Sequence, residues 1–101
     1  MTSEEVLRLI ENEIAGNWTR SNAHGVDLRR CLLRPPRKQV FEDLGGTKIE
    51  LWRVLDENPG GGYSIVFDEE EGSYGLATED IRRGWVFIGY YGTFLETLEN
   101  M

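Results

Sequence analysis

The sequence of 101 residues offers little material for covalent or metal chemistry, because it contains one cysteine, Cys31, and one histidine, His24. A single cysteine cannot form a disulfide within the chain, and this usage is typical of a reducing compartment. A zinc site would have to recruit carboxylates or a second chain as ligands. We therefore expect no metal site and no cofactor.

Long apolar runs are also missing. No run approaches the roughly 20 residues that a membrane-spanning helix needs. The first residues carry acids where a secretory signal would carry bases. We expect a cytoplasmic protein that does not associate with membranes.

Basic residues are in the minority, and the formal net charge is −7. This charge disfavours non-specific attraction to nucleic acid. The average hides an uneven distribution, since residues 20–41 hold six basic residues against one acid, whereas residues 42–101 hold four basic residues against thirteen acids. The sequence therefore predicts a local basic surface on an acidic protein.

The composition is that of a folded domain, with 40% hydrophobic and 29% charged residues. Eleven aromatic residues argue against disorder. The length suits one core, so we expect a single domain over residues 1–101.

Both ends of the chain are predicted to be helical. Thr2 and Glu5 have capping-box spacing, apolar residues recur every three or four positions up to Ile14, and Gly16 can end the helix in the left-handed conformation. Thr93 and Glu96 repeat the capping box before a shorter apolar stripe. The loop over residues 16–27 is expected to be anchored by Trp18.

Between these helices, short β-branched and aromatic runs alternate with turns at residues 45–47, 58–62, 69–73 and 80–84. The connections are too short for crossover helices, so the pairing is expected to be antiparallel. The predicted fold class is α+β: an N-terminal helix, an antiparallel meander of about five strands and a short C-terminal helix, with the helices on one face of the sheet.

The segment DEEEGSYG, residues 68–75, has enough carboxylates to raise the question of a cation site. Counted from Asp68, a glutamate falls at position twelve of a calcium loop, but Gly72 falls at five instead of six. The flanking runs also have strand character, whereas a calcium loop of this kind lies between helices. We interpret the segment as a hairpin turn with solvated carboxylates.

The basic segment is predicted to begin at residue 28 as an edge strand, kinked where Pro35 and Pro36 remove two backbone donors. Clustered cations attract anionic partners. Tyr90 and Tyr91 cannot both face inward on one strand, so an exposed aromatic anchor is expected there. The candidate binding residues are Arg29, Arg30, Arg34, Arg37, Lys38 and Tyr90.

The leading hypothesis is a small non-enzymatic interaction module that binds a protein partner, or a second copy of itself as a homodimer, through the arginine-rich kinked edge strand. An alternative is that carboxylates on neighbouring strands compensate the bases internally. Single-stranded nucleic-acid binding is a second, disfavoured alternative, since net charge opposes it and no nucleic-acid motif is present. A third is an enzyme that uses Cys31 with His24, for which no local signature exists.

Overall fold

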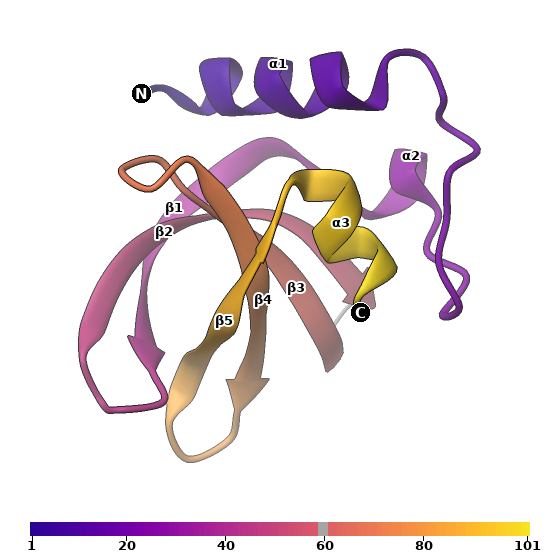
Figure 1. Cartoon of the computed structure of the whole chain (residues 1–101). Coiled ribbons are helices and arrows are strands. Elements are labelled where there is room, and N and C mark those ends of the chain that lie inside the picture. Colours follow the sequence, from indigo (N-terminus) through magenta and orange to yellow (C-terminus); the bar gives the residue numbers. More distant parts are fainter. Residues whose placement is uncertain (59–60) are drawn as a thin grey trace.

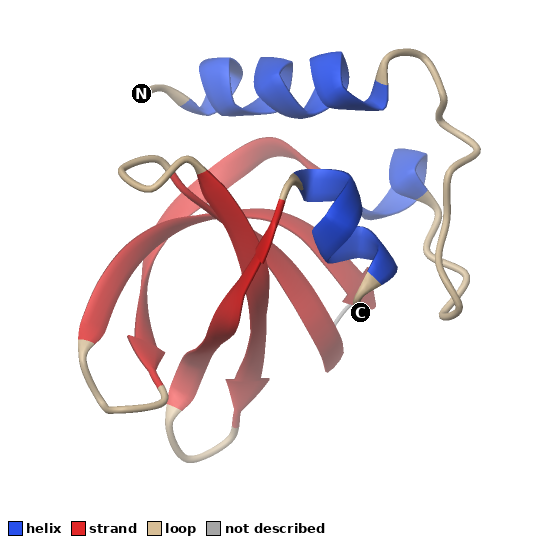
Figure 2. Cartoon of the chain, viewed as in Figure 1, coloured by secondary structure: helices blue, strands red, loops and turns tan. Residues whose placement is uncertain are grey.

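The computed structural model describes residues 1–58 and 61–101 and confirms the predicted order of helix, five-stranded meander and helix (Figures 1 and 2). The helices are α1 (Ser3–Ile14), α2 (Leu28–Cys31) and α3 (Phe94–Glu99). The strands are β1 (Leu32–Asp43), β2 (Lys48–Asn58), β3 (Gly61–Asp68), β4 (Ser73–Asp80) and β5 (Gly84–Gly92). Residues 59 and 60 of the expected turn at 58–62 lie outside the described part of the chain. Among the described helices, none is long and apolar enough to cross a membrane.

The meander closes into a barrel, which the sequence analysis did not predict. Consecutive strands pair in antiparallel fashion, and β1 also pairs with β5 in parallel, through Glu42 with Val86 and Asp43 with Phe87. Strand β1 is therefore an edge only over the part that precedes Glu42. Figure 1 shows the five strands curving around a common interior, with α1 lying above them in this view.

The basic segment is kinked, as predicted, but it does not begin as a strand. The β1–β2 register shifts between Leu32 and Arg37, the interval that contains both prolines. Residues 28–31 instead form the single helical turn α2, because the Asp27 side chain accepts a hydrogen bond from the Arg29 amide and caps it.

Two apolar clusters hold the fold together. The larger cluster lies between the outer wall of the barrel and the helices, and includes Val6, Ile10, Ile14, Trp52, Val54, Ile65, Phe67, Tyr74, Leu76, Phe94 and Leu98. The smaller cluster draws on all five strands and on no helix, so it fills the barrel interior; its buried members are Phe41, Leu51, Val66, Ala77 and Phe87. Neighbouring residues of β2, β3, β4 and β5 thus belong to different cores.

Both predicted capping boxes are present, at Thr2 with Glu5 and at Thr93 with Glu96. The left-handed turn at the end of α1 begins one residue before the expected glycine, at Ala15, and continues through Gly16. Helices α1 and α3 are joined by Glu13, whose carboxylate accepts hydrogen bonds from the amides of Phe94 and Leu95 at 3.1 and 2.7 Å.

The segment DEEEGSYG is a hairpin turn between β3 and β4, as predicted, with Gly72 at a positive φ of 66°. The expectation that its carboxylates all remain solvated is wrong for two of them. Asp68 is buried, and its Oδ1 accepts hydrogen bonds from the amides of Glu70 and Glu71. Glu69 binds Lys38, the Trp52 indole and the N-terminal ammonium group.

Candidate functional site

Five of the six predicted binding residues lie exposed along one continuous piece of chain, and four of them are arginines. Arg29 and Arg30 are on α2, and Arg34 and Arg37 are on β1. The Arg29 and Arg34 guanidinium groups lie 5.8 and 5.1 Å from the ring centre of Trp18. These distances are within the range of cation–π attraction. We call these four arginines together with Trp18 the arginine surface.

The local sequence explains how this surface forms. The cap at Asp27 turns residues 28–31 into one helical turn, and the prolines then shift the strand that follows. Trp18 is half-buried, with part of its ring packed against the larger apolar cluster. The indole therefore supplies a fixed platform on which two flexible cations converge from different elements.

The arginine surface is not compensated internally. In the described ranges 1–58 and 61–101, none of its four guanidinium groups forms an ion pair with a carboxylate. Asp27 is the one acid of the segment, and its Oδ1 caps α2. Four positive charges therefore face solvent on a protein whose net charge is −7.

Lys38 behaves differently from the four arginines. Its ammonium group donates to Glu69 at 2.8 Å, lies 3.6 Å from Glu50, and is 5.4 Å from the ring centre of Trp52. The hydrogen bond to Glu69 is the main cause that raises the pKa of Lys38. The alternative of internal compensation therefore holds for Lys38.

Tyr90 and Tyr91 are both partly exposed, because β5 is bulged relative to β4 where they lie. The Tyr90 hydroxyl donates to Asp68 Oδ2 at 2.5 Å, and its ring packs edge-on against Phe87 of the barrel interior. Burial, followed by the hydrogen bond to Asp68, raises the pKa of Tyr90. Tyr90 thus closes one end of the barrel, and its described contacts are not with the arginine surface.

Cys31 and His24 both contact Glu57, but through different groups. The Cys31 thiol donates to the Glu57 backbone carbonyl at 3.6 Å, and His24 Nδ1 pairs with the Glu57 carboxylate. Within the described chain no hydrogen bond joins the thiol to the imidazole. The arrangement ties the loop before α2 to the end of β2.

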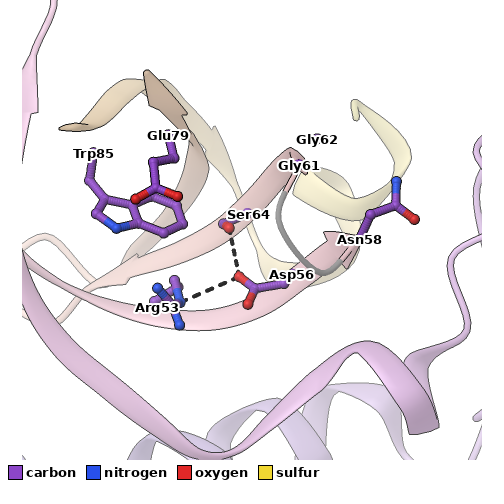
Figure 3. A pocket seen from close by; sticks show the side chains of 8 residues that line it. All are labelled: Arg53, Asp56, Asn58, Gly61, Gly62, Ser64, Glu79 and Trp85. Carbon is purple, nitrogen blue, oxygen red and sulfur yellow. Dashed lines mark hydrogen bonds and ion pairs between the residues drawn. The ribbon is translucent and has the colours of Figure 1, made fainter. Parts of the chain in front are cut away.

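A second candidate site lies at the end of the barrel opposite to Tyr90 and was not predicted. A cavity of about 270 Å³ is lined there by Arg53, Asp56, Asn58, Gly61, Gly62, Ser64, Glu79 and Trp85 (Figure 3). Four of these residues stand two positions along their strands from members of the interior cluster: Arg53 from Leu51, Ser64 from Val66, Glu79 from Ala77 and Trp85 from Phe87. Strand alternation therefore points them toward the barrel interior.

One signal in the sequence pointed to this cavity. Arg53 stands two residues after Leu51 in the run 51–55, which is otherwise apolar, so period-two alternation places a charge on the same face as a core leucine. A β-bulge between Arg53 and Leu55 then shifts the alternation, so that Val54 and Leu55 are both buried in the outer cluster. Without knowledge of the bulge, the inward face of this strand cannot be identified.

Comparisons of this chain with protein-family models, with curated proteins and with solved structures found no match.

Proposed function

We propose that this protein is a cytoplasmic, non-enzymatic interaction module whose arginine surface binds an acidic segment of a partner protein. The observation that carries the proposal is that four exposed guanidinium groups lack a carboxylate partner in the described residues. Cations on an acidic protein that are not used in its own fold are available to an anionic partner.

An acidic peptide segment suits this surface better than a nucleic acid. The surface has four cations and one aromatic platform, Trp18, whereas single-strand binders combine a long basic groove with several stacking rings. Among the remaining aromatic residues, Trp52 and Tyr74 are buried and cannot serve as stacking rings. The net charge of −7 also repels a long polyanion more strongly than a short acidic peptide.

Arginine contributes more than charge at such a surface. The planar guanidinium group binds a carboxylate with two parallel hydrogen bonds, and it stacks on an aromatic ring at the same time. Because Arg29 and Arg34 already lie over Trp18, less side-chain freedom is lost when a partner carboxylate binds them.

The test compares two triple variants of equal charge. The first is Arg29→Glu, Arg30→Glu and Arg34→Glu; the matched control is Arg8→Glu, Lys48→Glu and Arg82→Glu, three exposed cations that form no ion pair among the described residues. Fluorescence anisotropy with a labelled oligoglutamate peptide is the readout. We expect the first variant to lose binding by about tenfold or more, and the control to retain most of it.

Equal binding by the two triple variants would show that the arginine surface is not the site. Tighter binding of an oligothymidine of the same length than of the peptide would replace the proposal with single-stranded nucleic-acid binding. A dimer that is present in sedimentation equilibrium and dissociated by the arginine reversal would make a second copy of this chain the partner.

A further inference from the structure

The cavity at the end of the barrel contains a charged group whose hydrogen-bonding capacity is not used. The Arg53 side chain is 15% exposed, its Nε is buried, and this nitrogen has no hydrogen-bond partner among the described residues. Its one ion pair is with Asp56, at 3.4 Å from Nε to Oδ1. A guanidinium group carries five N–H donors, and buried donors are nearly always satisfied. No donor of the Arg53 guanidinium group forms a hydrogen bond to another described residue. Nε faces Asp56, and the remaining donors are available to a ligand in the cavity that Arg53 lines.

The position of Arg53 is fixed from two sides. Its guanidinium carbon lies 4.8 Å from the ring centre of Trp85, and Asp56, which holds Nε, also accepts a hydrogen bond from the Ser64 hydroxyl at 2.7 Å. Trp85 is itself packed edge-on against Phe41 of the interior cluster. Figure 3 shows Arg53, Asp56 and Ser64 linked by these interactions at the wall of the cavity. Such an Arg can bind a ligand without a large loss of side-chain entropy.

The cavity also carries negative charge. Glu79 is directly opposite Trp85 in the β4–β5 register, so the two side chains share one face of the sheet. Glu79 is exposed at the rim and forms no ion pair within residues 1–58 and 61–101. Asp56, in contrast, is already engaged by Arg53 and Ser64.

These charges distinguish between ligand classes. A phosphate dianion would meet the carboxylates of Asp56 and Glu79, and a simple cation would meet the guanidinium group of Arg53. A molecule that carries a carboxylate and an ammonium group a few bonds apart matches both Arg53 and Glu79. The volume of about 270 Å³ restricts it to a small molecule.

We propose that this cavity binds a free amino acid, whose carboxylate accepts hydrogen bonds from Arg53 while its ammonium group faces Glu79. The Trp85 ring and the backbone of Gly61 and Gly62 line the remaining space. This site shares no residue with the arginine surface, so either proposal can be wrong without affecting the other.

The test uses the proteinogenic amino acids, each at millimolar concentration, added to isotope-labelled protein in NMR titrations. We expect at least one free amino acid to shift the Trp85 indole resonance and the Gly61 and Gly62 amides in a saturable manner. The methyl ester and the N-acetyl derivative of that amino acid should both bind more weakly. For the ester we expect a loss of about tenfold or more, because it has no carboxylate to accept two charge-assisted hydrogen bonds from Arg53. No saturable shift with any amino acid, or equal binding of either derivative, would overturn the proposal.

Two variants locate the binding groups. Glu79→Gln changes an exposed residue and is expected to fold normally, with affinity for the bound amino acid reduced about two- to fivefold. Glu71→Gln, an exposed glutamate in the turn between β3 and β4, is the matched control, and it should bind like the wild type. Arg53→Lys retains the positive charge but loses the planar guanidinium group that binds a carboxylate with two hydrogen bonds. The affinity for the amino acid should therefore fall further than in Glu79→Gln. If Glu79→Gln binds the amino acid with wild-type affinity, the ammonium group does not face Glu79 and the proposal is wrong. This outcome can be read even if Arg53→Lys does not fold.

Discussion

Gly75 on β4 faces the backbone carbonyl of Gly89 on β5 so closely that a Cβ at position 75 would overlap it. The same Cβ would lie 2.7 Å from the Phe87 ring. Position 75 is two residues before Ala77 and therefore points toward the barrel interior. The absence of a side chain lets β4 and β5 approach where the β5 register is irregular.

We expect Gly75→Ala to lower the free energy of unfolding by about 1–3 kcal/mol, since the new methyl group must displace backbone or a packed ring. Urea denaturation measures the change. The matched control is Gly89→Ala, where no heavy atom lies within 4 Å of the added Cβ. We expect that variant to stay within about 0.5 kcal/mol of the wild type. Equal destabilisation of the two variants would contradict the close approach at Gly75.

Glu13 provides the second prediction, because one carboxylate binds the first two amides of α3 from the neighbouring helix. Glu13→Ala removes both acceptors and is expected to cost about 1–3 kcal/mol of stability. Hydrogen exchange at the Phe94 and Leu95 amides should accelerate more than exchange in β3. Glu11→Ala, an exposed position of the same helix, serves as the control and should leave the exchange of α3 unchanged.

The parts of the fold that could be predicted are those that depend on neighbours in the chain. Thr2 with Glu5 and Thr93 with Glu96 mark helix starts through hydrogen bonds within one turn, and Gly72 marks a tight turn by its own conformational freedom. Barrel closure depends on Glu42 and Asp43 meeting Val86 and Phe87, more than forty residues away along the chain. No local pattern specifies that pairing.

The candidate sites show the same division. The basic segment is visible as a composition bias, but composition does not separate Lys38, which is paired, from Arg34, which is not. Arg53 is visible in the sequence as a charge within an apolar run, but its role depends on a bulge and on Trp85, which lies on β5, the last strand of the barrel. Tyr90 was identified as an exposed aromatic, whereas its bond to Asp68 depends on the fold.

Tyr90 provides the third prediction, which separates a structural role from a binding role. Tyr90→Phe retains the ring against Phe87 but leaves Asp68 Oδ2 without its described donor in a buried position. We expect a loss of about 1–2 kcal/mol in the free energy of unfolding. Tyr91→Phe removes a hydroxyl with no hydrogen bond to other described residues, and thermal unfolding should show little change. If Tyr91→Phe is the more destabilising of the two, the bond to Asp68 is not important for stability.

The last prediction concerns the dependence of stability on pH at Glu69, where three donors converge on one carboxylate. The Lys38 ammonium group, the Trp52 indole and the N-terminal ammonium group bind it at 2.8, 3.1 and 3.1 Å, and in this order they lower its pKa from the ordinary value of 4.5 to about 2. Because the pKa is lower in the folded state, the contribution to stability is complete above pH 4.5 and is lost as the pH falls toward 2.

Glu69→Gln removes this titration, so the variant should be less stable than the wild type at neutral pH and the difference should narrow as the pH falls from 4.5 toward 2. Urea denaturation of both proteins across that pH range measures the narrowing. Glu71→Gln changes an exposed carboxylate of the same turn that accepts no described hydrogen bond, so its effect at neutral pH should be smaller. A constant difference between Glu69→Gln and the wild type from pH 7 to pH 2 would show that the three contacts do not bind the ionised carboxylate preferentially. Such a constant difference would assign the effect of Glu69 to the shape and packing of its side chain, since a group makes stability depend on pH only when its pKa differs between the folded and unfolded states.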